Sequence, residues 1–266
     1  MTRTTALGLQ PPQSSYCLQT SLVAPRMTVF CDFDGPIVDV SDRYYSTYLL
    51  ALADTQAYYE DLGIYLRLQT LTKQQFWQMK QERVPDVEIA MRSGLQGEQI
   101  EMFLSRVATI VNQPTLLHKD RLQPGVNWAI NLLHSRGVRL VLVTLRYQRE
   151  ATQILRNHGL ARLFSGIYGS EDRHTAYQNY AEVKTKLLKQ AITEQFADDR
   201  QQELAWMIGD TEADILAGQA LDIPTVALTC GIRSHCRLKK FQPTHIHTDL
   251  LAAAHHLLGI NQLVRA

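Results

Sequence analysis

Short apolar runs alternate with helical stretches along most of this chain. The runs MTVFCD, VRLVLVT, LFSGIYG, LAWMIGD and IPTVALT occupy residues 27–32, 138–144, 163–169, 204–210 and 223–229. Uninterrupted apolar runs of this length are typical of strands buried on both faces, as in a parallel sheet. The helical stretches between them supply the crossovers that parallel strands require. The sequence therefore predicts an α/β fold with a doubly wound, mostly parallel, five-stranded, Rossmann-like sheet.

One region departs from this alternation. Between about Tyr44 and Gln123 the sequence shows helical periodicity and no strand pattern. A segment of this length is too long for a loop in a compact domain. We therefore expect residues 44–123 to form a helical cap subdomain, inserted into an α/β core made of residues 27–43 and 124–266.

The first 26 residues differ in composition from the rest. They contain Arg3 and Arg26 but no Asp or Glu, and Pro11-Pro12 blocks a continuous helix. An acid-free, Ser/Thr-rich N-terminus can be an organelle transit peptide, although transit peptides are usually more basic and amphipathic. We expect residues 1–26 to be a disordered or loosely packed tail.

Composition excludes several classes of protein. The net charge of +1, from 27 basic and 26 acidic residues, argues against binding nucleic acid by bulk electrostatics. No apolar run approaches the roughly 20 residues of a membrane-spanning helix. The four cysteines are too few and scattered for a disulfide framework, which favours a reducing compartment. We expect a cytoplasmic protein without nucleic-acid or membrane partners; its oligomeric state cannot be inferred from the sequence.

Polar residues follow three of the predicted strands. Asp32 and Asp34 come at the end of the first strand, Thr144 ends the second and Asp210 ends the fourth. The carboxyl ends of parallel strands meet at one edge of the sheet, so these side chains are expected to lie together. Carboxylates gathered there repel one another unless a cation neutralises them, and hard oxygen ligands favour Mg²⁺. A metal beside a hydroxyl donor suits a transferring phosphoryl group.

Four motifs in this order resemble those of the haloacid dehalogenase superfamily of phosphohydrolases, in particular members with a helical cap of the phosphoglycolate-phosphatase kind. Residues 32–39 match D-x-D-G-x-x-x-D, and Thr144 follows an apolar strand. A Lys opens a later helix, and residues 209–214 match G-D-x-x-x-D. The resemblance extends over roughly residues 27–230. Each motif alone is weak, but four in order on the expected strands are specific.

The resemblance implies a role for each motif residue. Asp32 would be the nucleophile that forms an aspartyl-phosphate, and also a Mg²⁺ ligand. Asp34 would be the general acid and base and would bind the metal through its backbone carbonyl, while Asp210 would complete the ligand set. Thr144, the backbone N–H of Leu145 and the motif Lys would hold the phosphoryl oxygens.

Three residues leave alternatives open. Lys184 fits the helix-start position of the motif Lys better than Lys186 does. Asp214 either supports the metal site without binding the ion directly or begins a helix as a capping residue, and both can hold together. Arg146 either binds an anionic substrate or is exposed.

The remaining His and Cys residues lack a recognised zinc spacing. We expect Cys230, His235 and Cys236, and likewise residues 245–247, to be ordinary loop residues. His255 and His256 are expected at a solvated helix edge.

The expected function is Mg²⁺-dependent hydrolysis of a small phosphorylated metabolite. The same aspartyl-phosphate chemistry would serve a sugar phosphomutase, and a non-catalytic binding protein on this fold is a further alternative. The presence of every motif residue disfavours the latter. Specificity is expected from cap residues, among which Lys80, Arg83 and Arg92 are candidates that the sequence does not rank.

Overall fold

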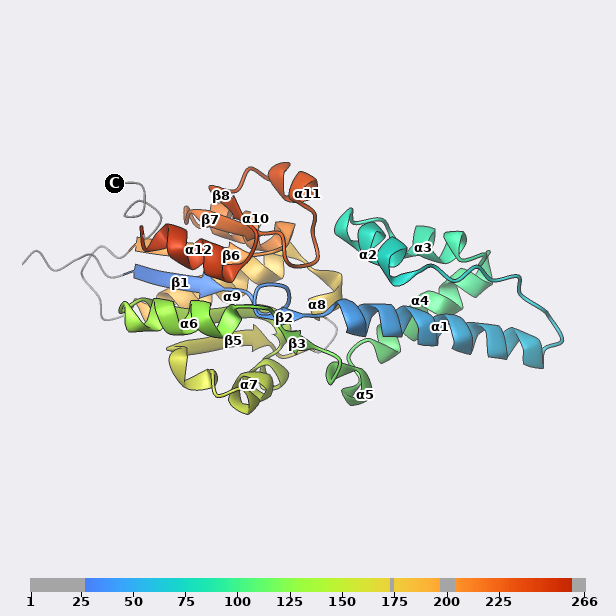
Figure 1. Cartoon of the computed structure of the whole chain (residues 1–266). Coiled ribbons are helices and arrows are strands. Elements are labelled where there is room, and N and C mark those ends of the chain that lie inside the picture. The colour runs from blue at the N-terminus through green and yellow to red at the C-terminus, as the bar shows by residue number, and fades with distance from the viewer. Residues whose placement is uncertain (1–26, 173–174, 197–203, 260–266) are drawn as a thin grey trace, which may run out of the picture.

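The computed structural model describes residues 27–172, 175–196 and 204–259, so the expected tail at 1–26 lies outside the described residues. Its main sheet has six strands in the order β5-β4-β1-β6-β7-β8 (Figure 1). They are β1 (Met27–Cys31), β4 (Arg139–Tyr147), β5 (Gly166–Ser170), β6 (Leu204–Gly209), β7 (Thr225–Leu228) and β8 (His245–His247). All neighbouring pairs are parallel, which confirms the predicted doubly wound sheet. The strand order changes direction between β1 and β6, where open α/β sheets bind their ligands.

The predicted number of five strands is wrong. Residues 245–247, which we expected to be a loop, form β8 and pair with β7 from Val226 to Leu228. This strand has three half-buried residues, and two of them are histidines. Because it carries no apolar run, it gives no strand signal in the sequence.

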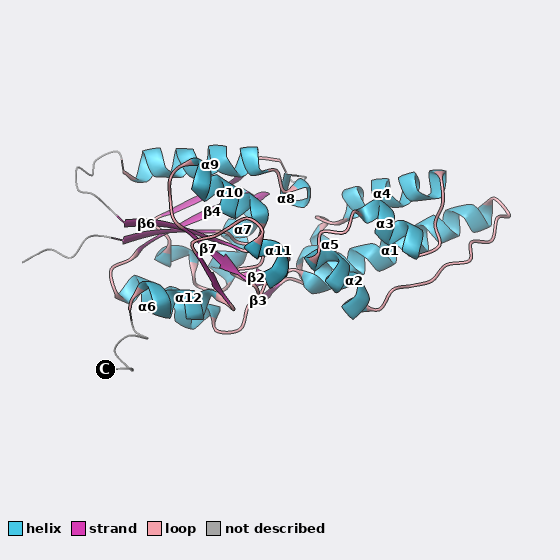
Figure 2. Cartoon of the chain, turned by 90° about the horizontal axis from the view of Figure 1, so that it is seen from above, coloured by secondary structure: helices cyan, strands magenta, loops and turns pink. Residues whose placement is uncertain are grey.

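Helices cover both faces of the sheet (Figure 2). One face packs against α6 (Val126–Ser135), α7 (Gln148–Asn157) and α12 (Leu250–Leu257), and the other against α9 (Ala181–Gln195) and α10 (Glu212–Ala220). Side chains alternate between these faces along β1, where Val29 and Cys31 join one core and Phe30 the other. Burial on both sides explains why the sequence of β1 is continuously apolar.

Shorter elements complete the sheet-bearing part. These are α8 (Thr175–Gln178), α11 (His235–Lys239), a 3₁₀ turn at Ala161–Leu163, and an antiparallel pair of β2 (Val38–Asp39) and β3 (Arg121–Leu122). We expected no strand between about Tyr44 and Gln123, where β3 lies, but two residues are too few to produce a periodic pattern. Asp39 accepts a hydrogen bond from the Ser41 N–H at 2.8 Å, at the point where the next helix begins.

Five helices between β2 and β3 extend away from the carboxyl ends of the strands (Figure 1). They are α1 (Ser41–Asp61), α2 (Lys73–Gln81), α3 (Asp86–Arg92), α4 (Glu98–Ile110) and α5 (Pro114–Leu117). Tyr48 lies at their centre, with its ring 5.0 Å from that of Phe76 and 6.2 Å from that of Phe103. These aromatic rings pack the helices against one another, and they belong to the same buried cluster as one face of the sheet. The division into a cap at 44–123 and a core stays a prediction. None of the described helices has the length and apolar character needed to cross a bilayer.

Candidate active site

Three aspartates meet at the carboxyl ends of β1 and β6. Asp32 follows β1 and Asp210 follows β6, and these strands are parallel neighbours. Asp214 lies in the first turn of α10. One carboxylate oxygen from each of the three lies within 4.8 Å of the others, and all three side chains are buried. The structure thus brings Asp32, Asp210 and Asp214 into one acidic cluster.

Glycines hold the carboxylate of Asp210 in place. A Cβ atom at Gly231 would lie 2.0 Å from Asp210 Oδ2, and one at Gly35 would lie 2.2 Å from Asp210 Cγ. Gly35 also has a φ of +96°, which L side chains rarely adopt. Asp210 is therefore packed directly against backbone on two sides.

Lys184 supplies a positive charge inside the acidic cluster. Its Nζ lies 2.7 Å from Asp32 Oδ1 and 2.7 Å from Asp214 Oδ1, and the residue is buried. Burial lowers the pKa of Lys184, but the charges of Asp214 and Asp32 outweigh it and raise this pKa above its ordinary value. Lys186 is exposed, so the structure places Lys184 rather than Lys186 in the site.

The acidic residues are strongly perturbed by burial. Burial raises the pKa of Asp32 to about 7, with Lys184 opposing this shift and the charge of Asp214 adding to it. Burial also raises the pKa of Asp210 well above its ordinary value, assisted by the charges of Asp214 and Asp32. One ammonium therefore does not balance the carboxylates around it.

The acidic cluster fits a divalent cation. Asp210 Oδ2 accepts a hydrogen bond from the Ile232 N–H at 2.5 Å, whereas its buried Oδ1 has no hydrogen-bond partner among the described residues. A buried carboxylate oxygen without a partner is costly, and a bound cation would satisfy it. The available donors are hard oxygen atoms, as Mg²⁺ prefers.

Asp214 has two roles that the sequence could not separate. Its Oδ2 accepts hydrogen bonds from the N–H and the hydroxyl of Thr211, at 3.1 and 2.8 Å, and so caps α10. Its Oδ1 faces Lys184. One carboxylate therefore begins the helix and holds the lysine in the acidic cluster.

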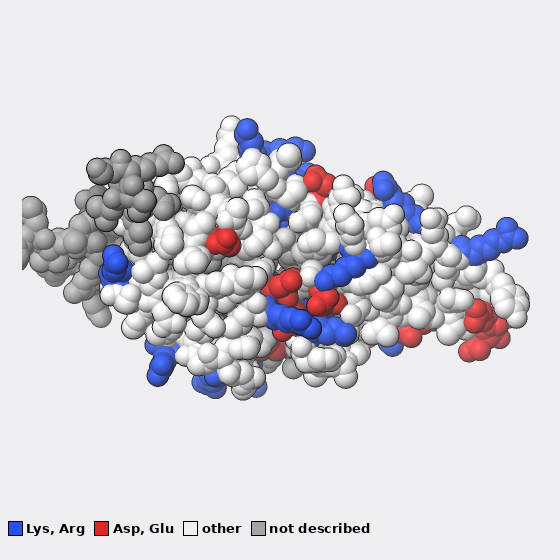
Figure 3. Space-filling view, in the orientation of Figure 1, with Lys and Arg blue, Asp and Glu red and all other residues white. Residues whose placement is uncertain are grey.

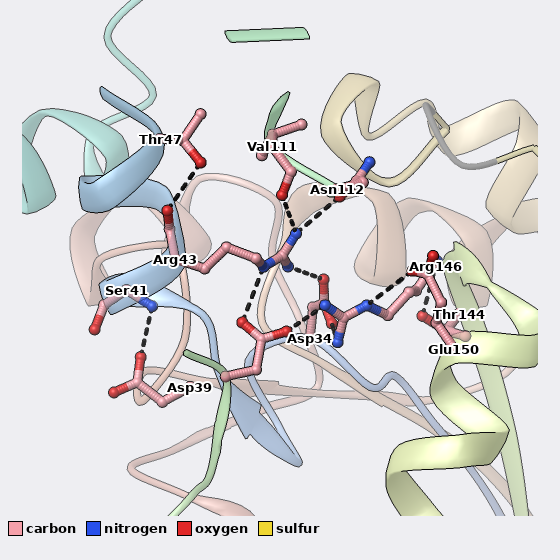
Figure 4. Close-up of polar contacts among 11 residues, drawn as sticks. Asp34, Asp39, Ser41, Arg43, Thr47, Val111, Asn112, Thr144, Arg146 and Glu150 are labelled. Atoms are coloured by element: carbon pink, nitrogen blue, oxygen red, sulfur yellow. Dashed lines mark hydrogen bonds and ion pairs between the residues drawn. The ribbon is translucent and has the colours of Figure 1, made fainter. Parts of the chain in front are cut away.

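Asp34 lies outside the acidic cluster and contacts two arginines (Figure 4). Arg43 of α1 places Nη2 3.1 Å from Asp34 Oδ2, and Arg146 of β4 places Nη1 3.2 Å from Asp34 Oδ1. Asp120 contacts both arginines, with Arg43 Nε 2.9 Å from its Oδ1 and Arg146 Nη2 beside its Oδ2. We call these four residues the Asp34–Arg43–Asp120–Arg146 network.

This network is buried and joins distant parts of the chain. Arg43 is only 1% exposed, and its Nη1 also donates to Asn112 Oδ1 at 2.8 Å and to the Val111 carbonyl at 3.3 Å. Arg146 is 2% exposed, so the alternative that it is an exposed residue is wrong. No local pattern indicates Arg43 or Asp120, because the two residues are 77 positions apart in the sequence.

A cavity of about 60 Å³ lies above the acidic cluster. Its walls include four of the expected site residues, Asp32, Asp34, Thr144 and Leu145. They also include residues that belong to no motif, among them Tyr44, Lys80, Tyr177, Asn179 and Arg233. Charged side chains of both signs gather on the surface where the five helices meet the sheet-bearing part (Figure 3). Thr144 is buried, and its Oγ1 accepts a hydrogen bond from the Arg146 N–H at 3.1 Å.

The structure ranks the three cationic residues that we proposed for specificity. Lys80 lines the cavity, with Nζ 4.9 Å from the centre of the Tyr177 ring. Arg83 forms an ion pair with Glu212. Arg92 pairs with a glutamate one turn earlier on the exposed surface of α3 and does not line this cavity. Lys80 is therefore the one of the three that faces the site directly.

Arg233, which follows β7, connects the sheet-bearing part to α2. Its Nε lies 2.8 Å from Glu212 Oε2, and its Nη1 donates to the Lys80 carbonyl at 3.1 Å. The next residue, Ser234, donates its N–H to the Gln81 carbonyl at 3.2 Å. These contacts close one side of the cavity.

Replacing Gly35 should disturb the carboxylate of Asp210, in addition to the backbone strain that a side chain causes at any position of positive φ. Gly35→Ala and Gly159→Ala both put a side chain at positive φ, which costs about 1–2 kcal/mol, but open space surrounds Gly159. We expect the melting temperature of wild type and Gly159→Ala to rise on addition of Mg²⁺, and that of Gly35→Ala to respond much less. Equal responses in the two variants would contradict the packing role of Gly35.

The raised pKa of Asp32 predicts a pH dependence of stability. Because this pKa is about 7 in the folded protein and near its ordinary 3.8 when unfolded, the folded state retains a proton that the unfolded chain has lost. The contribution of protonated Asp32 to the free energy of unfolding is fully present below about pH 4 and is lost as the pH rises through 7. In chelator, Asp32→Asn should therefore show a flatter decrease of unfolding free energy from pH 5 to pH 8, measured by urea denaturation at several pH values. Parallel curves for variant and wild type would contradict this assignment.

Removing the charge of Arg43 should strongly destabilise the fold. Arg43→Met leaves two buried carboxylates with one cation fewer, at an expected cost of about 3–5 kcal/mol. Arg106→Met is the matched control, because the Arg106–Asp54 pair is exposed and contributes about 0–1 kcal/mol. Urea denaturation of both variants measures the difference, and similar small effects would show that the network contributes little.

Comparison with known proteins agrees with this arrangement. A sequence model of the haloacid dehalogenase-like hydrolases matches residues 29–228. A 5'-nucleotidase from Pseudomonas aeruginosa is 28% identical over 138 residues, and a phosphoglycolate phosphatase from Aliivibrio fischeri is 30% identical over 146 residues. These matches cover 52% and 55% of this chain and 59% of each relative. The chain thus spans less than two thirds of the length of these relatives.

The fold is shared with solved structures. The crystal structure of a predicted phosphatase from Clostridium acetobutylicum superimposes with a TM-score of 0.61 at 17% identity, covering 89% of this chain and all of that one. At this identity the likeness concerns the fold alone. The family match, by contrast, extends over most of the chain and includes the strands that carry Asp32, Thr144 and Asp210. The chain belongs to the haloacid dehalogenase-like hydrolase family.

Proposed function

We propose that this protein is a Mg²⁺-dependent phosphatase that hydrolyses a small phosphorylated metabolite through an aspartyl-phosphate. The observation that carries the proposal is the position of the Asp32 carboxylate. It lies 2.7 Å from Lys184, within the acidic cluster, and on the wall of a cavity that Thr144 also lines. The proposed nucleophile and a hydroxyl thus line one cavity, and a cation and a candidate metal site lie next to the nucleophile.

The residues divide the reaction into two steps. In the first, a carboxylate oxygen of Asp32 bonds to phosphorus as the ester P–O bond breaks, and Asp34 gives a proton to the departing alcohol oxygen. In the second, Asp34 takes a proton from water, whose oxygen bonds to phosphorus and releases inorganic phosphate and Asp32.

Other groups hold the charge that spreads over the phosphoryl oxygens. Thr144 and Leu145 line the cavity and Lys184 contacts Asp32, so we assign the Thr144 hydroxyl, the Leu145 N–H and Lys184 as donors to these oxygens. Mg²⁺, held by the side chains of Asp32 and Asp210 and by the Asp34 carbonyl, would neutralise part of the charge when bound. In chelator we expect activity to vanish and to return when Mg²⁺ is added.

The network orients the carboxylate of Asp34, to which we assign the acid–base role. Arg43 and Arg146 contact different oxygens of its carboxylate, so its orientation beside the cavity is fixed from two sides. Arg43 belongs to α1, whereas Arg146 belongs to the sheet. The proton donor is therefore positioned jointly by the two parts of the chain that enclose the cavity.

The size of the cavity favours a small substrate. A buried water occupies roughly 10–15 Å³ measured in the same way, so about 60 Å³ accommodates a phosphoryl group with a short organic part. Phosphoglycolate phosphatases are among the relatives, which makes small phosphorylated acids the first compounds to assay. Assaying phosphate release alongside isomer formation distinguishes the phosphatase from a phosphomutase.

Separate variants of Asp32 and Asp34 test the two roles. Asp32→Asn removes the nucleophile, so we expect no phosphoenzyme and activity at background. Asp34→Asn removes the proton donor and base, each typically contributing about 10²–10⁴-fold. The loss should be smaller for an aryl phosphate than for an alkyl phosphate, because a good leaving group needs less protonation.

Rapid quenching with a labelled aryl phosphate provides the direct measurement. Asp34→Asn should accumulate a phosphoenzyme that hydrolyses slowly. If it instead slowed aryl and alkyl esters by the same factor without accumulating phosphoenzyme, Asp34 would not be the acid and base.

A further inference from the structure

Three histidines lie together at the β8 edge of the sheet, outside the active site. His245 and His247 are the first and last residues of β8, so their side chains project from the same face of the sheet. His256 lies in the last turn of α12, which packs on this face. The ring centre of His256 is 4.2 Å from that of His245 and 4.8 Å from that of His247, and the latter two are 6.2 Å apart.

The cluster contains a ring nitrogen that the protein does not satisfy. His247 Nε2 is buried and has no hydrogen-bond partner among the described residues. Such a nitrogen is costly to bury unless it meets a ligand. Trp206 closes one side of the cluster, with its ring 5.8 Å from that of His245. The unsatisfied nitrogen therefore lies in a partly closed, nitrogen-rich corner.

We propose that His245, His247 and His256 bind a transition-metal ion of the Zn²⁺ type. Tetrahedral coordination with Zn–N bonds of about 2.0–2.1 Å places imidazole ring centres about 5 Å apart. Two of the observed distances between ring centres, 4.2 and 4.8 Å, are below this value, and the third, 6.2 Å, is above it. Imidazole nitrogen suits Zn²⁺, Ni²⁺ and Cu²⁺, whereas the oxygen atoms of the acidic cluster suit Mg²⁺.

Binding requires the rings to turn rather than the backbone to move. In the described part of the chain, only the acidic cluster brings ligand atoms of three or more residues within 4.8 Å of one another. The ring nitrogens of the three histidines do not all lie this close, so they must approach one another when they bind an ion. Rotation about χ2 achieves this, because that torsion is broad for histidine. His256 is exposed and His245 half-buried, so neither ring is locked in a core.

The bound ion would connect two elements that otherwise meet through a small contact. β8 has three residues and lies at the edge of the sheet, and α12 is the last described helix. An ion held by both would bind the folded state and not the unfolded chain, in which the three rings are not held together. It would therefore raise the free energy of unfolding.

The test uses the full chain without a polyhistidine tag, with Mg²⁺ in excess to occupy the acidic cluster. Titration with Co²⁺ should give one equivalent with the strong visible absorption of a tetrahedral site, and Zn²⁺ should displace it and raise the melting temperature. His256→Ala should weaken binding by at least about 10–100-fold. His255→Ala is the matched control, since this neighbouring histidine lies outside the cluster, and it should bind like wild type.

Each result decides the proposal. Absence of tetrahedral Co²⁺ binding in wild type, or equal binding by His256→Ala, would overturn it. Weakened binding by His255→Ala to the same degree would also overturn it, because the ion would then not be held by the three named rings. His245→Gln, compared with wild type for its melting temperature in chelator, separates loss of the ion from loss of folding.

Discussion

The excess of buried negative charge beneath the cavity is the constraint on which the rest of the site depends. Asp32 and Asp214 pair with the ammonium of Lys184, whereas Asp210 forms no ion pair with any described residue. The raised pKa values of Asp32 and Asp210 express this imbalance, since burial and mutual repulsion both favour the protonated forms. Backbone packed against Asp210 prevents that carboxylate from moving away. The fold thus keeps in place a repulsion between carboxylates that a divalent cation would relieve, so cation binding would favour the ionised form of Asp32.

A second group of charges is balanced within the protein itself. In the Asp34–Arg43–Asp120–Arg146 network, two carboxylates meet two guanidinium groups, and Glu150 lies 4.0 Å from Arg146 Nε at its edge. Paired and hydrogen-bonded charges avoid most of the penalty that an isolated buried charge would impose. Because Asp34 precedes the five helices, Arg43 lies in the first turn of α1 and Asp120 follows α5, the network also connects both ends of the insertion to the sheet. The same contacts orient the proposed proton donor.

The sequence predicted those features that leave local patterns. Continuous apolar runs indicated the buried parallel strands, and the motifs placed Asp32, Thr144 and Asp210 at their ends. The preference for Lys184 agrees with its place on the buried side of α9, which it shares with Leu188 and Ala191 at helical spacing. Contacts between distant segments left no such pattern. Neither the pairing of Arg43 with Asp120 nor the approach of His256 to β8 can be read from neighbouring residues, and β8 is too short to show periodicity.

The contacts around the cavity differ in what it costs to break them. On the side of α2, the cavity is closed by the Arg233 and Ser234 hydrogen bonds to backbone carbonyls and by the pair of exposed Arg83 with buried Glu212. A single hydrogen bond contributes about 0.5–1.5 kcal/mol, or about 1.5–3 kcal/mol where a charged group takes part. Near β2 and β3, the network is almost wholly buried, and removing one partner of a buried ion pair costs about 3–5 kcal/mol. Separating the network would leave buried charges without their partners. Contacts with Arg43 and Arg146 therefore keep the carboxylate of Asp34 oriented beside the cavity.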